Sequence, residues 1–111
     1  MTHDLPPAVP QLKQAAFIWE TGSANEIQIG QLPVPRPGPD DVLVQMVASA
    51  VNHVDLFVRS GAYRTELSFP FVIGRDLVGT VVQTGENVHG FAHGDTVWCN
   101  SLGYAGRQGT W

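Results

Sequence analysis

The 111-residue sequence contains one cysteine, Cys99, and no long apolar run. One cysteine cannot form an internal disulfide or supply a thiolate-rich zinc site, and it suits a reducing compartment. No stretch approaches the roughly 18 apolar residues of a membrane-spanning helix, and the first ten residues lack the basic and apolar regions of a signal peptide. We therefore expect a soluble, cytoplasmic protein that does not bind a membrane.

Positive charge is also scarce. Six Lys and Arg residues stand against ten Asp and Glu residues, for a formal net charge of -4, and the basic residues form no cluster. Nucleic-acid binding needs clustered basic side chains that neutralise phosphates, so nucleic acid is not an expected partner. The 12 glycines, 8 prolines and 43% hydrophobic residues are typical of a turn-rich β domain with a single core.

The order of the sequence patterns predicts a tail followed by one mainly β domain. Three prolines and few packable residues predict a disordered or extended tail over residues 1–12, and the domain covers residues 13–111. Both faces of segment 41–51 are apolar, which predicts a central strand or a barrel strand. Gly74 and Gly79 are predicted points of bending or close backbone approach. Strand patterns cover residues 14–20, 26–32, 41–51 and 77–83, and segment 93–100 supplies a hairpin turn followed by a further strand.

One short helix is predicted, from about His53 to Ser60. Asn52 can cap its N-terminus, and Asp55 stands at the third helical position, as in a capping box. Gly61 can end the helix in the left-handed conformation. These signals are local, so they specify both ends of the helix.

Two further patterns give little support for a ligand site. Gly103, Gly106 and Gly109 recur every three residues, but the dinucleotide fingerprint has a different spacing and a following helix. A loop between strands is therefore expected there. Of the four histidines only His53 lies in an informative setting, and it has no cysteine or carboxylate partners at metal-ligand spacing.

Three segments in order carry a resemblance to a known family: ASAVNHVDLFVRSGAY, PFVIGRDLVGTVVQTGENVHGF and GDTVW. Together they resemble the catalytic, GroES-like domain of the medium-chain dehydrogenase/reductase superfamily, and the resemblance covers residues 13–111. It implies a mainly β fold, a GroES-like, partly open β-barrel with one or two short helices.

The resemblance also implies a branch of that superfamily. Zinc alcohol dehydrogenases carry a Cys-His pair where this sequence has Asn52 and His53. Where they carry Gly-His-Glu, it has Gly74, Arg75 and Asp76. A guanidinium about 4 Å from a divalent cation costs on the order of 8 kcal/mol at an effective dielectric constant near 20. The four-cysteine structural zinc loop is missing too, so the chain resembles the zinc-independent quinone oxidoreductases and enoyl reductases, and no metal site is expected.

Members of that branch transfer a hydride from NADPH to a quinone or to the β-carbon of an activated double bond. Tyr63 matches the proton-donating tyrosine of the enoyl reductases, and a phenol is protonated at neutral pH; a packing role is the alternative. Asn52 matches the asparagine that lines the nicotinamide pocket. His53 matches a histidine near the cofactor ribose, with a solvent-facing role as the alternative. Arg75 contacts substrate or a cofactor phosphate, or forms an ion pair with Asp76 or another acid.

The resemblance leads us to expect the N-terminal part of a longer NADPH-dependent enzyme that acts on a small-molecule quinone or enone. The sequence stops at Trp111, in what looks like the start of another strand, and the cofactor-binding domain of the family is not among these residues. Hydride transfer needs nicotinamide and substrate held together, so the chain alone should be inactive. The alternative is a stand-alone GroES-like binding or interaction module without catalysis. Exposed strand edges favour a homodimer in either case.

Overall fold

The structure is a computed structural model that describes residues 9–111. Residues 1–8 of the predicted tail lie outside the described residues. In the described part of the chain no helix is long and apolar enough to cross a membrane. The elements follow in the order β1 (Leu12–Ile18), η1 (Ala24–Glu26, a 3-10 helix), β2 (Gln28–Pro33), β3 (Val42–Ala48), α1 (His53–Ser60), β4 (Phe71–Val72), β5 (Leu77–Thr84) and β6 (Thr96–Cys99).

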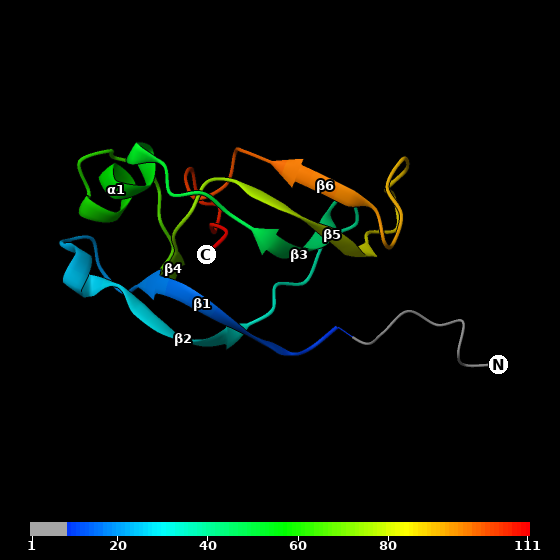
Figure 1. The fold of residues 1–111 in the computed structure, drawn as a ribbon, viewed down its shortest axis with the longest axis horizontal. Helices are drawn as coiled ribbons and strands as arrows, with labels where there is room; N and C mark the ends of the chain where they lie inside the picture. The colour runs from blue at the N-terminus through cyan, green and yellow to red at the C-terminus, as the bar shows by residue number, and fades with distance from the viewer. Residues whose placement is uncertain (1–8) are drawn as a thin grey trace.

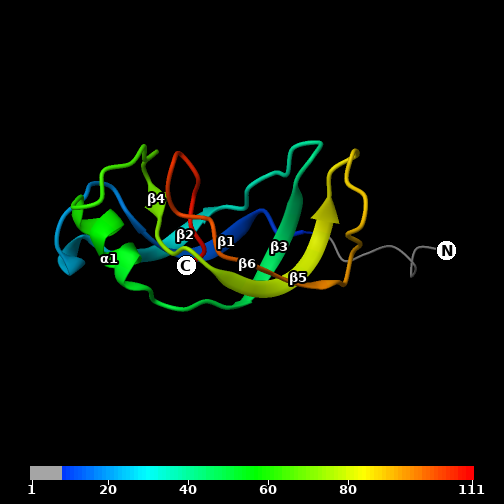
Figure 2. The same ribbon diagram turned by 90° about the horizontal axis from the view of Figure 1, so that it is seen from above.

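The strands form two antiparallel, three-stranded sheets, ordered β2-β1-β4 and β3-β5-β6. Figure 1 shows the two sheets as separate layers, with α1 at one end of the molecule. Seen from above in Figure 2, the loop between β2 and β3 and the loop between β5 and β6 project at the end of the molecule opposite α1. The mainly β fold with one short α-helix is therefore confirmed.

The core lies around β1 and β4. Phe17 pairs with Val72, and Ile18 pairs with Phe71, across the β1–β4 ladder. Ile18 and Phe71 are buried together with Ile73 and with Val58 of α1. This contact holds the helix against the first sheet and fixes the position of the helix N-terminus.

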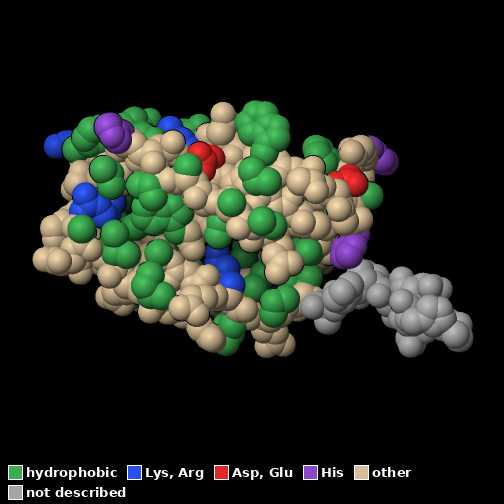
Figure 3. Space-filling view, viewed as in Figure 1, with side chains coloured by type: hydrophobic (Ala, Val, Ile, Leu, Met, Phe, Trp, Pro, Cys, Tyr) green, Lys and Arg blue, Asp and Glu red, His purple; other side chains and the backbone are tan. Residues whose placement is uncertain are grey.

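Of the two positions expected for segment 41–51, central or in a barrel, the central one is wrong, because β3 lies at the edge of its sheet. β5 has partners on both sides, whereas β3 pairs with β5 alone. Val47 of β3 is 73% exposed. An apolar pattern on both faces does not distinguish a strand buried between neighbours from an edge strand with exposed apolar side chains. Figure 3 shows hydrophobic side chains spread widely over one face of the molecule.

The helix has the bounds that its local signals predict. The backbone N–H of Asn52 donates to Oδ2 of Asp55 over 2.8 Å. Gly61 has φ 89°, and its N–H donates to the carbonyl of Phe57 over 3.1 Å. The capping role of Asp55 and the left-handed role of Gly61 are confirmed.

Residues 101–111 form a returning loop rather than a phosphate-binding loop that opens a helix. The N–H of Gly109 donates to the carbonyl of Val72 over 2.7 Å, and the N–H of Ala16 donates to the carbonyl of Trp111 over 3.4 Å. The last residues therefore lie against β4 and β1 without forming the predicted strand. In the described part of the chain β2, β3, β4 and β6 are edge strands, and pairing of two copies through them stays a prediction.

Candidate functional site

A hydrogen-bonded cluster forms where the β3–α1 connection meets the segment before β5. Oδ2 of Asp76 accepts from Nδ2 of Asn52 over 3.0 Å, and Oδ1 accepts from the backbone N–H of Ala50 over 2.9 Å. The Asn52 bond, followed by the Ala50 bond, holds the pKa of Asp76 below its usual value. The stabilising contribution of Asp76 is therefore present above its unfolded pKa and is lost as the pH falls through its lowered folded pKa.

Asp55 lies on the other side of Asn52 and is 3% exposed. Burial raises its pKa, because the charged form loses water; the hydrogen bond from the Asn52 N–H and the nearby charge of Arg75 partly oppose this rise. Stability from this group is greatest below its unfolded pKa and falls as the pH rises through its folded pKa. As the pH rises, Asp55 therefore lowers the stability of the fold, whereas Asp76 raises it.

Replacing Asp55 with asparagine tests this assignment. In Asp55→Asn the amide oxygen can still accept from the Asn52 N–H, and the buried charge is gone. At pH 7 we therefore expect the free energy of unfolding to fall by no more than about 0.5 kcal/mol, or to rise. Asp55→Ala also removes the acceptor and should lose about 1 kcal/mol. Urea unfolding at pH 7 and pH 3 measures both. Equal losses in the two variants, or a wild-type-to-asparagine difference that does not change with pH, would contradict the assignment.

Arg75 does not pair with Asp76, and its expected contact with substrate or a cofactor phosphate stays a prediction. Its guanidinium lies 4.2 Å from the centre of the Tyr104 ring, a cation–π arrangement. Asp76 is instead bonded to Asn52 and Ala50, so the expected pair with Arg75 is wrong. Nε and Nη2 of Arg75 are buried without a hydrogen-bond partner among residues 9–111.

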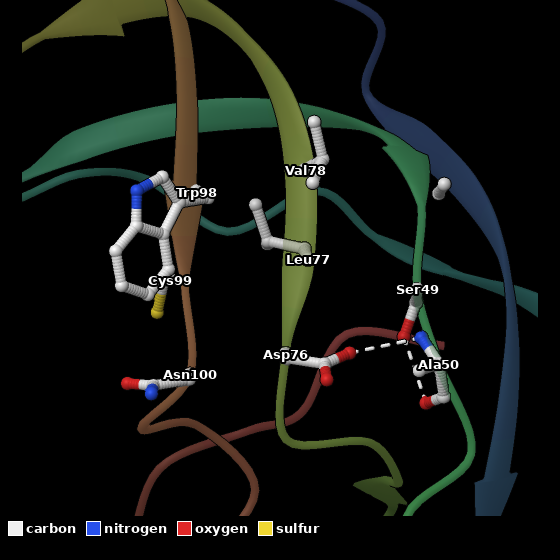
Figure 4. A pocket seen from close by; sticks show the side chains of 9 residues that line it. Ser49, Ala50, Asp76, Leu77, Val78, Trp98, Cys99 and Asn100 are labelled. Carbon is white, nitrogen blue, oxygen red and sulfur yellow. Dashed lines mark hydrogen bonds between the residues drawn. The ribbon is translucent and has the colours of Figure 1, made fainter.

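A cavity of about 560 Å³ adjoins Asp76. Figure 4 shows Asp76 pointing toward Ala50 and Ser49, with Trp98 and Asn100 on the other side. The volume lies within the range of small-molecule sites, and the lining is mainly apolar with a few polar groups. Its lining residues are Ala48, Ser49, Ala50, Asp76, Leu77, Val78, Trp98, Cys99 and Asn100.

The predicted site residues do not all converge. Asn52 precedes α1 and belongs to the Asp76 cluster. Tyr63 follows the other end of α1, a separation along the axis of about 12 Å for an eight-residue helix. Tyr63 is 43% exposed, and His53 is an exposed first residue of α1. The roles of Tyr63 and His53 therefore stay predictions.

Sequence patterns missed two contacts near the cluster. Tyr104 reaches Arg75 from the returning loop. Thr110, from the same loop, shares a 2.9 Å hydrogen bond with the hydroxyl of Ser49. No local sequence pattern predicts either contact, because each contact joins residues that are distant in sequence.

The described residues do not fit a zinc ion. Residues 9–111 contain no group of three or more His, Cys, Asp or Glu side chains close enough to hold a metal. At the two positions compared with the zinc enzymes, Nδ2 of Asn52 is bonded to Asp76, and Arg75 is a cation, which is not a metal ligand. Oδ1 of Asn52 can accept a hydrogen bond from an amide N–H, and its role at a nicotinamide stays a prediction.

Comparison with known proteins assigns the chain to a family. Residues 38–110 match the alcohol dehydrogenase GroES-like domain. The chain belongs to this family. It is thus a GroES-like domain of the medium-chain dehydrogenase/reductase superfamily, and the fold expected from the sequence is confirmed.

Several relatives are similar to this GroES-like domain. Quinone oxidoreductase of Mus musculus is 33% identical over 86% of the chain, and alcohol dehydrogenase 1 of Emericella nidulans is 42% identical over 84%. The chain spans only 30% and 27% of their lengths. These two relatives differ in their activity, so they do not assign the chain to one branch.

Two solved structures share the fold. A structure described as an NAD-dependent alcohol dehydrogenase has a TM-score of 0.80 and 33% identity, covering 88% of the chain and 35% of that protein. A mycobacterial protein complexed with NADPH has a TM-score of 0.74 and 34% identity, covering 84% of the chain and 29% of that protein. Similar GroES-like domains therefore occur in proteins that use nicotinamide cofactors.

Proposed function

We propose that the chain is the catalytic N-terminal domain of an NADPH-dependent oxidoreductase that reduces quinones or α,β-unsaturated carbonyl compounds without zinc. The observation that carries this proposal is the Asn52–Asp76 hydrogen bond, because it holds an amide and a carboxylate together where zinc alcohol dehydrogenases carry a cysteine ligand. Similarity to a quinone oxidoreductase and to a protein complexed with NADPH supports the substrate class and the cofactor.

In this proposal Asn52 orients the reacting ring, and Asp76 is a positioning residue. The nicotinamide supplies the hydride when NADPH is bound. Because Nδ2 of Asn52 is fixed on Asp76, the side chain has one orientation and presents Oδ1 as an acceptor. Asp76 is itself fixed by the N–H of Ala50. Such prior fixation lowers the cost of orienting the reactants.

Tyr63 is the proposed proton donor. Negative charge develops on the substrate carbonyl oxygen during hydride transfer, and a positioned hydroxyl stabilises that charge and donates its proton. The exposure of Tyr63 leaves it accessible to a substrate. Tyr63 and Asn52 lie at opposite ends of α1, so both can act only if substrate and nicotinamide together span the length of this helix.

Oxidation of NADPH with a quinone or an enone tests the proposal. The assay uses the protein at its natural length, identified with an antibody against this chain, because the family relatives are longer. We expect activity to persist in a metal chelator. Tyr63→Phe should lower kcat for the enone about 100-fold with little change in KM, since it removes a proton donor and keeps the ring.

Tyr104→Phe is the matched control. It also removes one phenolic hydroxyl, but the remaining ring can still stack on Arg75, so kcat should stay within about twofold of wild type. Loss of activity in the chelator would contradict zinc independence. Equal kcat values for wild type and Tyr63→Phe would remove Tyr63 from the chemistry. A natural product near 12.0 kDa that does not oxidise NADPH would favour the stand-alone binding module.

A further inference from the structure

Lys13 is the only lysine in the sequence, and it lies on β1 opposite Leu32 of β2. Its side chain lines a second cavity of about 250 Å³, which shares no lining residue with the cavity beside Asp76. The walls of this second cavity are apolar apart from Lys13 and Gln108. The apolar residues are Leu32, Pro33, Pro35, Pro70 and Val72.

The amide of Gln108 is already used within the protein. Its Oε1 accepts from the N–H of Val72 over 2.6 Å. Its Nε2 donates to the carbonyls of Ser68 and Pro70, each over 3.1 Å. Both N–H groups are thus occupied, and the amine of Lys13 is the remaining side-chain donor in the lining of this cavity.

Burial lowers the pKa of Lys13, and no acidic group among residues 9–111 offsets this effect. An ammonium group against apolar walls is costly unless an anion pairs with it. The cavity therefore combines an apolar lining with one cationic group that lacks a counter-charge in the described part of the chain.

We propose that this cavity binds a small amphiphilic carboxylate, with the carboxylate on Lys13 and the alkyl chain against the three prolines. Charge complementarity identifies the anionic end, and the lining identifies the apolar end. The volume of about 250 Å³ suits a short-chain carboxylate, of which hexanoate is a convenient probe. This binding site does not depend on the proposed redox function.

Titration with hexanoate, followed by NMR of protein labelled with ¹³C-lysine, tests the proposal directly. Lys13 is the only lysine of residues 1–111, and the loss of its signal in Lys13→Arg assigns it in a longer protein. We expect its Cε resonance to shift and saturate. Hexanol, which has the same chain without the charge, should bind about tenfold more weakly, and hexylamine should not bind.

Substitutions at Lys13 separate the charge from the shape of the cavity. Lys13→Met keeps an unbranched side chain and should weaken hexanoate binding by about tenfold or more, whereas Lys13→Arg should keep the affinity within a few-fold. Far-ultraviolet circular dichroism checks that both variants fold. Equal binding of hexanoate and hexanol to the wild type, equal affinity of Lys13→Met, or an unchanged Lys13 signal would each overturn the proposal. The comparison of hexanoate with hexanol needs no variant and so holds even if a variant fails to fold.

Discussion

Replacing Phe71 with alanine is expected to lower the free energy of unfolding by about 3–5 kcal/mol. Phe71 is 1% exposed and packs with Ile18, Val58 and Ile73. It also forms half of β4, a strand of two residues that pairs with β1. The loss of its side chain leaves a cavity at the contact between α1 and the first sheet. Urea unfolding monitored by circular dichroism measures the change.

Phe91→Ala is the control for this substitution. Phe91 is 52% exposed and lies in the turn before β6, so its removal should change the free energy of unfolding by no more than about 0.5 kcal/mol. A similar loss in the two variants would show that the Phe71 cluster is not the main core of the domain.

Replacing Gly74 with alanine should cost about 2–5 kcal/mol. Gly74 has φ +111°, where a side chain adds about 1–2 kcal/mol of backbone strain. An added Cβ would also lie 2.4 Å from Cδ1 of Trp111 and 2.5 Å from Oγ1 of Thr110. Overpacking of this kind costs about 1–3 kcal/mol. Because Gly74 precedes Arg75 and Asp76, the substitution should also disturb the proposed site.

Gly90→Ala separates the two causes. Gly90 has a similar φ of +87°, but an added Cβ there would meet nothing within 4 Å. We therefore expect a loss of only about 1–2 kcal/mol, from backbone strain alone. Thermal or urea unfolding of both variants gives the difference, which reports the close approach of the returning loop to Gly74. Losses of the same size would contradict that close approach.

The sequence predicted the parts of the fold that depend on neighbouring residues. The bounds of α1 follow from Asp55 and Gly61, which act within a turn of their own positions. β4 and η1 were missed, because a two-residue strand has no periodicity and forms only through its pairing with β1. The edge position of β3 was not predicted either, because the residue pattern of a strand does not show how many neighbouring strands pair with it.

The sequence predicted which residues belong to the candidate site better than it predicted which of them are in contact. Asn52 was singled out both for capping and by resemblance, and the structure places it next to Asp76. The bond between them joins residues 24 apart, and the Tyr104 contact with Arg75 comes from a loop beyond β6. Such contacts depend on the tertiary fold. The residues of the cluster therefore follow from the sequence, whereas the hydrogen-bond partners of Asp76 depend on the tertiary fold.

The pairing of β1 bears on how the domain folds during its synthesis. β1 meets β2 soon after both have been translated, but its other edge pairs with β4 through Phe17 and Val72. At roughly 5–20 residues per second, several seconds of translation separate these two events. During that interval a nascent strand with an unpaired edge is open to chaperones or to neighbouring chains. Ladders between segments so far apart also favour refolding on the millisecond-to-second scale rather than in microseconds.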